Sequence, residues 1–286
     1  MTTEPVLIFL HIPKTAGTTF HKILERNYSP SRTLTFSGDT HPEEIESFIK
    51  LSEPQRAHYR LIKGHLEFGL HRFVPGNSTY ITFMREPIAR ALSFYYHASS
   101  HPDHYLYRLI TEEGVDLKTL LERGTTEELF NLQTRMIAGY KNYSVAALDS
   151  SVLENAKENG RRHFCLVALT EQFDASLLLL RRAFNWSQPF YLKKNVNLRK
   201  QISDGVDAKT LALLREANAL DLELYEFART LFETRRRAAG RVFESELRRF
   251  QRLNRVCAPA QETYHVVKHG IKRLVPGGRK SSSSRC

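Results

Sequence analysis

Apolar side chains follow two alternating patterns along this chain: short continuous runs, and stretches with helical spacing. Residues 5–10 are apolar throughout, as expected for a strand buried on both faces of a parallel sheet. After a polar loop, Phe20, Ile23 and Leu24 recur at the spacing of a helix. The N-terminal region is therefore predicted to form a strand, a loop and a helix.

The same order repeats further along the chain. Residues 79–84 are rich in β-branched and aromatic side chains and predict a strand, after which a helix begins with Pro87 at its first position. Residues 163–169 predict another strand before a helix over 172–184, and a shorter strand is expected at 60–63. This alternation predicts an α/β fold, with a mostly parallel sheet flanked by helices.

Helices dominate the rest of the predicted architecture. Residues 103–160 are mainly helical in pattern, and residues 207–253, rich in Leu, Ala, Glu and Arg, predict one or two long helices. Apolar periodicity then fades, and the chain ends in small, polar and basic residues. We predict a single domain over 1–253, with a long helical C-terminal part, and a basic, disordered tail over 254–286.

Composition restricts the partners of this protein without selecting one. The 286 residues are 41% apolar and 26% charged, which suffices for a large core. The formal charge of +11 favours polyanions, whether nucleic acid, acidic polysaccharide or phosphorylated nucleotides. The three cysteines are widely scattered and form no disulfide framework, which is typical of a reducing compartment.

The loop after the first strand has the residue types of an anion site. A helix N-terminus offers unpaired N–H groups and a positive dipole end, which favour phosphate-like groups. In this loop Lys14 adds a cation, Gly17 permits close approach of the backbone to a ligand, and the threonine hydroxyls can donate further hydrogen bonds. An ordinary helix cap is the alternative interpretation. The predicted anion-binding residues are Lys14, Thr15, Ala16, Gly17, Thr18 and Thr19.

This loop differs from an ATP-binding P-loop, which has two glycines before a Lys-Ser/Thr pair. Residues 13–19 instead resemble the 5′-phosphosulfate loop of carbohydrate sulfotransferases that use PAPS (3′-phosphoadenosine 5′-phosphosulfate), a family that includes the heparan sulfate 2-O- and 6-O-sulfotransferases. Residues 85–96 resemble the family's 3′-phosphate motif. The resemblance covers residues 5–230 and implies a P-loop-like fold and sulfuryl transfer from PAPS to a hydroxyl group.

The resemblance also implies residues that hold the donor. Arg85, at a strand end, can make a bidentate contact to the 3′-phosphate. Ser93 follows about two helical turns later and can donate its hydroxyl to the same group. Arg199 belongs to a segment that resembles the one closing over the nucleotide. We therefore expect PAPS as cosubstrate and PAP, its desulfated form, as product.

A catalytic base is implied in the same way. Gly64 and His65 resemble a segment of the uronyl 2-O-sulfotransferases whose histidine is the base, and an imidazole suits proton removal near neutral pH. Lys14 is expected to stabilise charge on the departing phosphate oxygen. The predicted reaction is an in-line displacement without a metal, and the acceptor is expected to be an anionic or neutral glycan.

Other functions share part of this pattern. A phosphotransferase or NTPase on the same fold would use ATP and need a carboxylate site for Mg²⁺. A protein-tyrosine sulfotransferase would have the same donor motifs, and a polyanion-binding protein would need only positive charge. Ordered nucleotide motifs favour the sulfotransferase over nucleic-acid binding, and a homo-oligomer is compatible with the sequence.

Two further clusters are interpreted as solvated. His97, His101 and His104 have a spacing similar to metal ligands, but Pro102 interrupts their helix. The arginines between residues 235 and 255 are interpreted as the solvent face of a long helix, with docking of a polyanionic acceptor as the alternative.

The expected location differs from that of the Golgi-resident animal enzymes with these motifs. The first residues lack a basic signal-peptide region, and the apolar run that follows is too short to span a bilayer. We therefore expect a cytoplasmic protein of bacterial origin, without stable membrane insertion.

Overall fold

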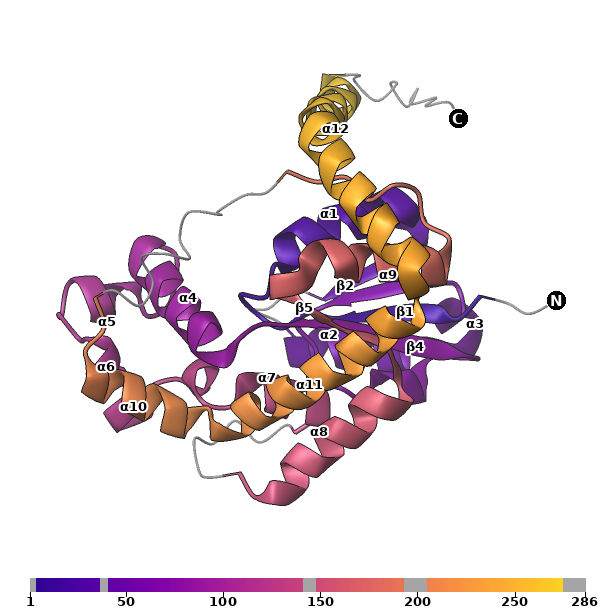
Figure 1. Ribbon diagram of the computed structural model, residues 1–286. Helices are drawn as coiled ribbons and strands as arrows, with labels where there is room; N and C mark the ends of the chain where they lie inside the picture. Colours follow the sequence, from indigo (N-terminus) through magenta and orange to yellow (C-terminus); the bar gives the residue numbers. More distant parts are fainter. Residues whose placement is uncertain (1–3, 37–40, 141–147, 193–204, 275–286) are drawn as a thin grey trace, which may run out of the picture.

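Five parallel strands form the centre of the computed structural model (Figure 1). The structure describes residues 4–36, 41–140, 148–192 and 205–274, and in the last helix it describes side chains as far as residue 257. The strand order is β2-β3-β1-β4-β5, and every neighbouring pair is parallel. The predicted α/β class with a parallel sheet is confirmed. The strands are β1 (Val6–Leu10), β2 (Thr33–Phe36), β3 (Leu61–Gly64), β4 (Ser78–Met84) and β5 (Phe164–Leu169).

Strand β1 lies in the middle of the sheet, where both faces are covered. Its five residues are all buried, which explains the continuous apolar run in the sequence. Leu10 pairs with Gly64 of β3 on one side and with Thr82 of β4 on the other. The loops that follow these three strands therefore leave the same edge of the sheet side by side.

One group of helices covers both faces of the sheet, and a second group packs together beside it (Figure 1). In Figure 1, α1 and α9 lie on one side of the strands, and α7 and α8 lie on the other. α4, α5, α6 and α10 pack around a separate hydrophobic cluster. The helices are α1 (Gly17–Asn27), α2 (His41–Lys50), α3 (Glu53–Arg56), α4 (Pro87–Ser100), α5 (Tyr107–Thr111), α6 (Leu117–Arg123), α7 (Leu132–Ala138), α8 (Ser150–Arg162), α9 (Phe173–Phe184), α10 (Ala208–Ala217), α11 (Ala219–Ala238) and α12 (Gly240–Leu274).

The C-terminal helices differ from the prediction in one respect. The proposed boundary between residues 253 and 254 falls inside α12, which continues to Leu274. The buried side chains Phe243, Leu247 and Phe250 fix the first part of α12 on the domain. Beyond Asn254 the helix continues although its apolar periodicity fades, as a helix can propagate by one backbone hydrogen bond per residue from a part that is already formed.

Candidate active site

The ends of β1, β3 and β4 open into a cavity of about 1590 Å³. Parallel α/β sheets bind ligands at this edge, outside the carboxyl ends of the strands. Helices α4, α9, α11 and α12 supply residues to the other walls. The structure thus brings most of the sequence-predicted site into one space. The predicted residues that line the cavity are Lys14, Ala16, Gly17, Thr18, Thr19, His65, Arg85 and Ser93.

The loop between β1 and α1 holds an unusual backbone conformation. Lys14 and Ala16 have φ angles of 68° and 69°, in the left-handed region that non-glycine residues seldom adopt. Each such residue costs on the order of 1 kcal/mol or more. Alternating conformations of this kind turn successive N–H groups towards one point and form an anion-binding concavity. The loop therefore stores strain in a shape that suits a phosphate-like group.

The N-terminus of α1 is open to a ligand. Ala16 is the N-cap residue, and no side chain of the described structure caps this helix. The prediction placed Thr18 and Thr19 at the helix start; they lie inside the first turn, after Gly17. The N–H groups of that turn can therefore bind an anion.

The N-terminus of α4 has the opposite character. The Glu86 carboxylate accepts hydrogen bonds from the N–H groups of Ile88 (3.1 Å) and Ala89 (2.6 Å). Pro87 occupies the first helical position, as predicted. An acidic cap satisfies these donors and repels a second anion. Of the two helix N-termini at these strand ends, only that of α1 therefore offers free N–H groups to an anion, and the Arg85 and Ser93 side chains line the same cavity.

Thr15 has a structural role in the loop. Its side chain is fully buried, and its hydroxyl donates to the carbonyl of Ile12 (2.8 Å). The hydroxyl of Thr170, which follows β5, donates to the Thr15 carbonyl (3.1 Å). Thr15 does not line the cavity, so its hydroxyl fixes the shape of the loop while its neighbours face the ligand space.

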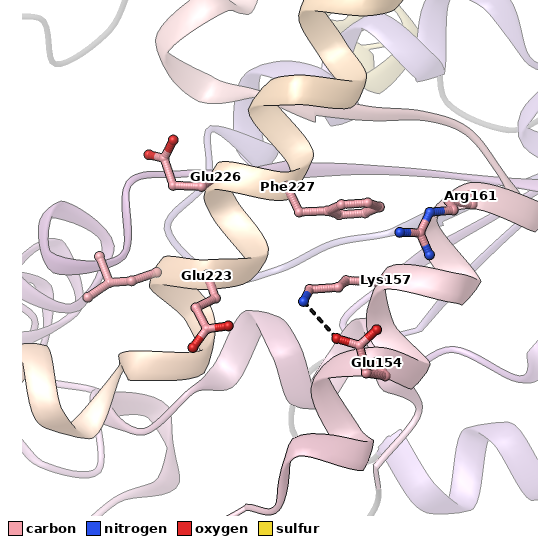
Figure 2. Close-up of a pocket in the computed structure, with 7 residues that line it drawn as sticks. Glu154, Lys157, Arg161, Glu223, Glu226 and Phe227 are labelled. Carbon is pink, nitrogen blue, oxygen red and sulfur yellow. Dashed lines mark hydrogen bonds and ion pairs between the residues drawn. The ribbon is translucent and has the colours of Figure 1, made fainter.

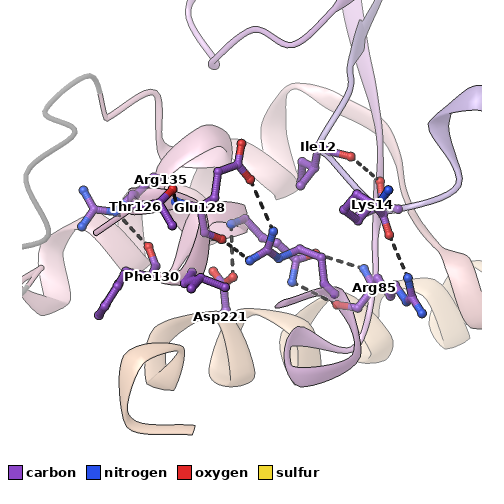
Figure 3. Close-up of polar contacts among 12 residues, drawn as sticks. Ile12, Lys14, Arg85, Thr126, Glu128, Phe130, Arg135 and Asp221 are labelled. Carbon is purple, nitrogen blue, oxygen red and sulfur yellow. Dashed lines mark hydrogen bonds and ion pairs between the residues drawn. The ribbon is translucent and has the colours of Figure 1, made fainter. Parts of the chain in front are cut away.

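Lys14 and Arg85 place two cations on one wall of the cavity (Figure 3). The Arg85 guanidinium donates from Nη1 to the carbonyl oxygen of Lys14 (3.1 Å). Burial lowers the pKa of Lys14, and the nearby Arg85 lowers it further, whereas Glu128 acts in the opposite direction. Two like charges held together in this way raise the affinity for a polyanion, because binding relieves their repulsion.

The backbone of Arg85 is held by residues distant in sequence. The Gln133 side chain accepts from the Arg85 N–H and donates to the Arg85 carbonyl, both at 3.0 Å. Asp221, from the first turn of α11, in turn accepts from the N–H groups of Gln133 (3.1 Å) and Thr134 (2.7 Å). Burial raises the pKa of Asp221, although Arg90 and these hydrogen bonds oppose the rise. This support for Arg85 has no signature in the local sequence.

A buried ion pair lies behind the same wall. Arg90 of α4 is fully buried, and its Nη1 lies 3.7 Å from the Glu128 carboxylate. Arg90 also donates to the Glu128 carbonyl oxygen. Glu128 lines the cavity, and burial raises its pKa while Arg90 opposes the rise. The pair anchors α4, which carries Ser93, to the segment before α7.

His65 follows β3 and faces the cavity. Gly64 before it has φ 149°, and a Cβ there would lie 2.3 Å from the Phe36 carbonyl oxygen, so no larger residue fits. The ring of His11 lies 4.5 Å from the His65 ring, measured between centroids. His11 lines the cavity too and was missed by the motif comparison. The sequence could have indicated His11 by its position, directly after the β1 segment and before the loop that leads to α1.

A further histidine gives the fold a testable acid sensitivity. Burial, followed by Lys63, lowers the pKa of His21 from 6.5 to about 4. The unfolded chain therefore binds this proton at higher pH than the folded chain, so its contribution to stability is complete above pH 6.5 and is lost as the pH falls towards 4. Between pH 6.5 and about 4, the unfolding free energy of the wild type should fall because His21 resists protonation in the fold. In His21→Gln this part of the fall, about 1.4 kcal/mol per pH unit, should be absent.

Urea unfolding of both proteins at pH 7 and pH 5 measures this difference. The pH dependence of the wild type alone does not isolate His21, because the raised pKa values of Asp221 and Glu128 make the fold more stable as the pH falls. The difference between wild type and variant removes these contributions. Parallel pH dependences for wild type and variant would contradict the prediction.

The histidines interpreted as solvated lie at the cavity as well. His97, His101 and His104 line it, and the rings of His97 and His101 are 3.8 Å apart. Within the described ranges, no group of three or more His, Cys, Asp or Glu residues could hold a metal ion. Arg199 lies outside the described residues, and its predicted role stays a prediction.

A second hollow, of about 510 Å³, lies between α8 and α11 (Figure 2). Lys157 pairs there with Glu154 (2.7 Å), and the Arg161 guanidinium lies 4.6 Å from the centroid of the Phe227 ring. None of the predicted donor or catalytic residues lines this hollow. The candidate active site is therefore the larger cavity.

These features define a class of protein: a P-loop-like α/β fold in which an uncapped helix N-terminus after β1, together with Lys14, and Arg85 after β4 line one cavity. The family model "Galactose-3-O-sulfotransferase" matches residues 2–271. The chain therefore belongs to the galactose-3-O-sulfotransferase family. This confirms the resemblance to carbohydrate sulfotransferases that the sequence motifs indicated.

Individual relatives agree with the family assignment. Galactose-3-O-sulfotransferase 3 of Mus musculus is 30% identical over 275 residues, which cover 87% of this chain and 62% of the relative. Heparan-sulfate 6-O-sulfotransferase 2 of Danio rerio is 29% identical, over 80% of this chain and 58% of the relative. This chain thus spans less than two thirds of either relative. The crystal structure of mouse sulfotransferase SULT7A1 complexed with PAP matches over 81% of this chain and 88% of that chain, at 13% identity and a TM-score of 0.31. No argument about this protein depends on that match.

The relatives correct the expected location. The prediction of a cytoplasmic, bacterial enzyme is wrong, because the related carbohydrate sulfotransferases come from animals, among them mouse, human and chicken. The lack of a basic signal-peptide region in the first residues does not by itself determine the location of a protein. Among the helices of the described residues, none combines the length and the apolar character needed to cross a membrane.

Proposed function

We propose that this protein transfers a sulfuryl group from PAPS to a hydroxyl of a carbohydrate, by in-line displacement. The observation that carries the proposal is the open α1 N-terminus, which faces the same cavity as Arg85 and His65. An anion site, a second cation for the 3′-phosphate and a base are the parts that this reaction needs. The family assignment supports the same reaction class.

The α1 amides and Lys14 bind the 5′ end of the donor. The strained loop presents its N–H groups before the ligand arrives, so little reorganisation accompanies the reaction. Lys14 stabilises the negative charge that develops on the 5′-phosphate oxygen as its bond to sulfur breaks. Arg85 and Ser93 bind the 3′-phosphate, which distinguishes this donor from ATP.

His65 is the proposed general base. As the acceptor oxygen forms its bond to sulfur, the hydroxyl proton moves to the His65 imidazole, which later releases it to water. The residue follows β3, adjacent to the phosphate loop that follows β1, so donor and base approach the acceptor from neighbouring strand ends. Arg199 would add a contact to the nucleotide.

The acceptor is proposed to be a glycan, neutral or anionic. The names of the relatives include galactose and heparan sulfate as the acceptors of those enzymes. The walls of the cavity carry both signs of charge, because Asp103 and Glu127 line it together with Lys14 and Arg85. A polar, hydroxyl-rich ligand suits such a surface. No nucleic-acid partner is proposed, and a homo-oligomer is compatible with this function.

Calorimetric titration with PAP tests the donor. We expect PAP to bind to the wild-type protein and ATP to bind far more weakly, because only PAP offers a 3′-phosphate to Arg85. Transfer of labelled sulfate from PAPS to a galactose-terminated oligosaccharide and to a desulfated heparan oligosaccharide then tests the acceptor class. Preference for ATP would overturn the proposal in favour of a phosphotransferase, and transfer only to a tyrosine peptide would overturn the carbohydrate assignment.

A further inference from the structure

Two histidines outside the proposed mechanism lie directly behind the base. Leu10, the last residue of β1, pairs with Gly64, and the His11 N–H donates to the Gly64 carbonyl (2.9 Å). His11 and His65 therefore leave adjacent parallel strands at the same level. Their rings lie 4.5 Å apart between centroids, with an angle of 52° between their planes. The base thus packs on a second imidazole.

The ring of His11 is held on several sides. Phe9 stacks on it at 5.4 Å. Its Nδ1 lies 3.1 Å from Nε2 of His21, on α1. On the side of the phosphate loop, a Cβ added to Gly17 would lie 1.7 Å from His11 Nε2. Glycine at position 17 is therefore required by the position of His11, and the close approach of the Gly17 backbone limits movement of the ring on this side.

We propose that His11, held by its hydrogen bond to His21, is a positioning residue for His65; this rests on the proposed function. A base must present one nitrogen lone pair along the direction of the acceptor hydroxyl. A ring that packs on a fixed neighbour has fewer orientations, and small displacements of a reacting group cost large factors in rate. The contact between His11 and His21 also couples the tautomers of the two rings, because one of the facing nitrogens must donate and the other must accept.

The charges around the pair support this role. Burial lowers the pKa of His11 well below its usual value, and His65, His21, Lys14 and Lys63 lower it further. Lys63, on β3, is paired with Glu25 of α1 at 2.6 Å. His11 and His21 are thus uncharged at neutral pH. A proton taken up by His65 during turnover then meets no adjacent imidazolium.

The amides at position 21 separate positioning from packing. Glutamine places a nitrogen near the position of His21 Nε2, whereas asparagine is one methylene shorter and does not reach His11. We expect His21→Asn to lower kcat about tenfold or more, with the acceptor KM and PAP affinity unchanged, and His21→Gln to retain most of kcat. His58→Asn, at an exposed histidine far from the cavity, is the matched control.

Other outcomes decide against the inference. Equal kcat for His21→Asn and wild type would overturn the positioning role of His11. Equal losses of kcat in His21→Asn and His21→Gln would overturn it too. In both cases sulfate transfer by the wild type would still support the proposed function. Failure of the wild type to bind PAP and transfer sulfate would overturn both. If His21→Asn does not fold, His11→Asn serves instead, since it retains a donor near His21 and removes the ring behind His65. It should show the same loss of kcat, and wild-type kcat in that variant would contradict the inference.

Discussion

Replacement of His65 by alanine is expected to lower kcat by about 10²–10⁴-fold, the usual contribution of a positioned general base. The affinity for PAP should remain that of the wild type, because the proposed donor contacts come from the α1 amides, Lys14, Arg85 and Ser93. The expected signature is therefore a loss in turnover without a loss in donor binding. Initial rates with labelled PAPS and calorimetry with PAP measure the two quantities separately.

The control for His65→Ala is His58→Ala, which removes an exposed imidazole distant from the cavity. Its kcat should equal that of the wild type. Near-normal turnover in His65→Ala would eliminate this residue as the base. A parallel loss of PAP affinity would instead indicate that His65 helps to form the donor site.

Replacement of Arg85 by alanine is expected to weaken PAP binding by about 100-fold. A charged hydrogen bond to a buried phosphate contributes about 1.5–3 kcal/mol, and the upper value corresponds to this factor. The variant also loses the bond from Arg85 Nη1 to the Lys14 carbonyl, which helps to hold the phosphate loop. Calorimetric titration with PAP measures the change.

Two controls accompany Arg85→Ala. Arg85→Lys keeps the charge without the planar pair of donors, and we expect it to recover only part of the affinity. Arg229→Ala removes an exposed arginine that pairs with Glu226, and it should bind PAP like the wild type. Unchanged PAP affinity in Arg85→Ala would remove this residue from the donor site.

Local patterns predicted the elements that carry the site. The strands at 5–10, 60–63, 79–84 and 163–169 correspond closely to β1, β3, β4 and β5. The strand missed was β2 (Thr33–Phe36), a short strand at the edge of the sheet with one buried residue. An edge strand of this length has no continuous apolar run, so hydrophobic pattern alone does not distinguish it from a loop.

The motifs predicted residues of the loop after β1 and His65, which the structure brings to one cavity, but they did not distinguish the roles of the residues within the loop. Thr15 belongs to the loop motif, yet its hydroxyl is bonded to Ile12 inside the loop. The left-handed backbone at Lys14 and Ala16 is likewise invisible in residue types that ordinarily avoid it. Both features depend on contacts of the folded loop, including the bond from Thr170.

Local sequence patterns were sufficient to predict the alternation of strands and helices, the loop after β1, the candidate residues Lys14, His65 and Arg85, and the family. These are encoded in short segments, where the spacing of side chains reflects local backbone geometry. The contacts between groups distant in sequence became visible only in the folded structure. The packing of His11 on His65 and the support of Arg85 by Gln133 and Asp221 depend on strand order and on how α11 docks. Such proximity arises from the chain topology, because contacts between remote segments form only when the whole core assembles.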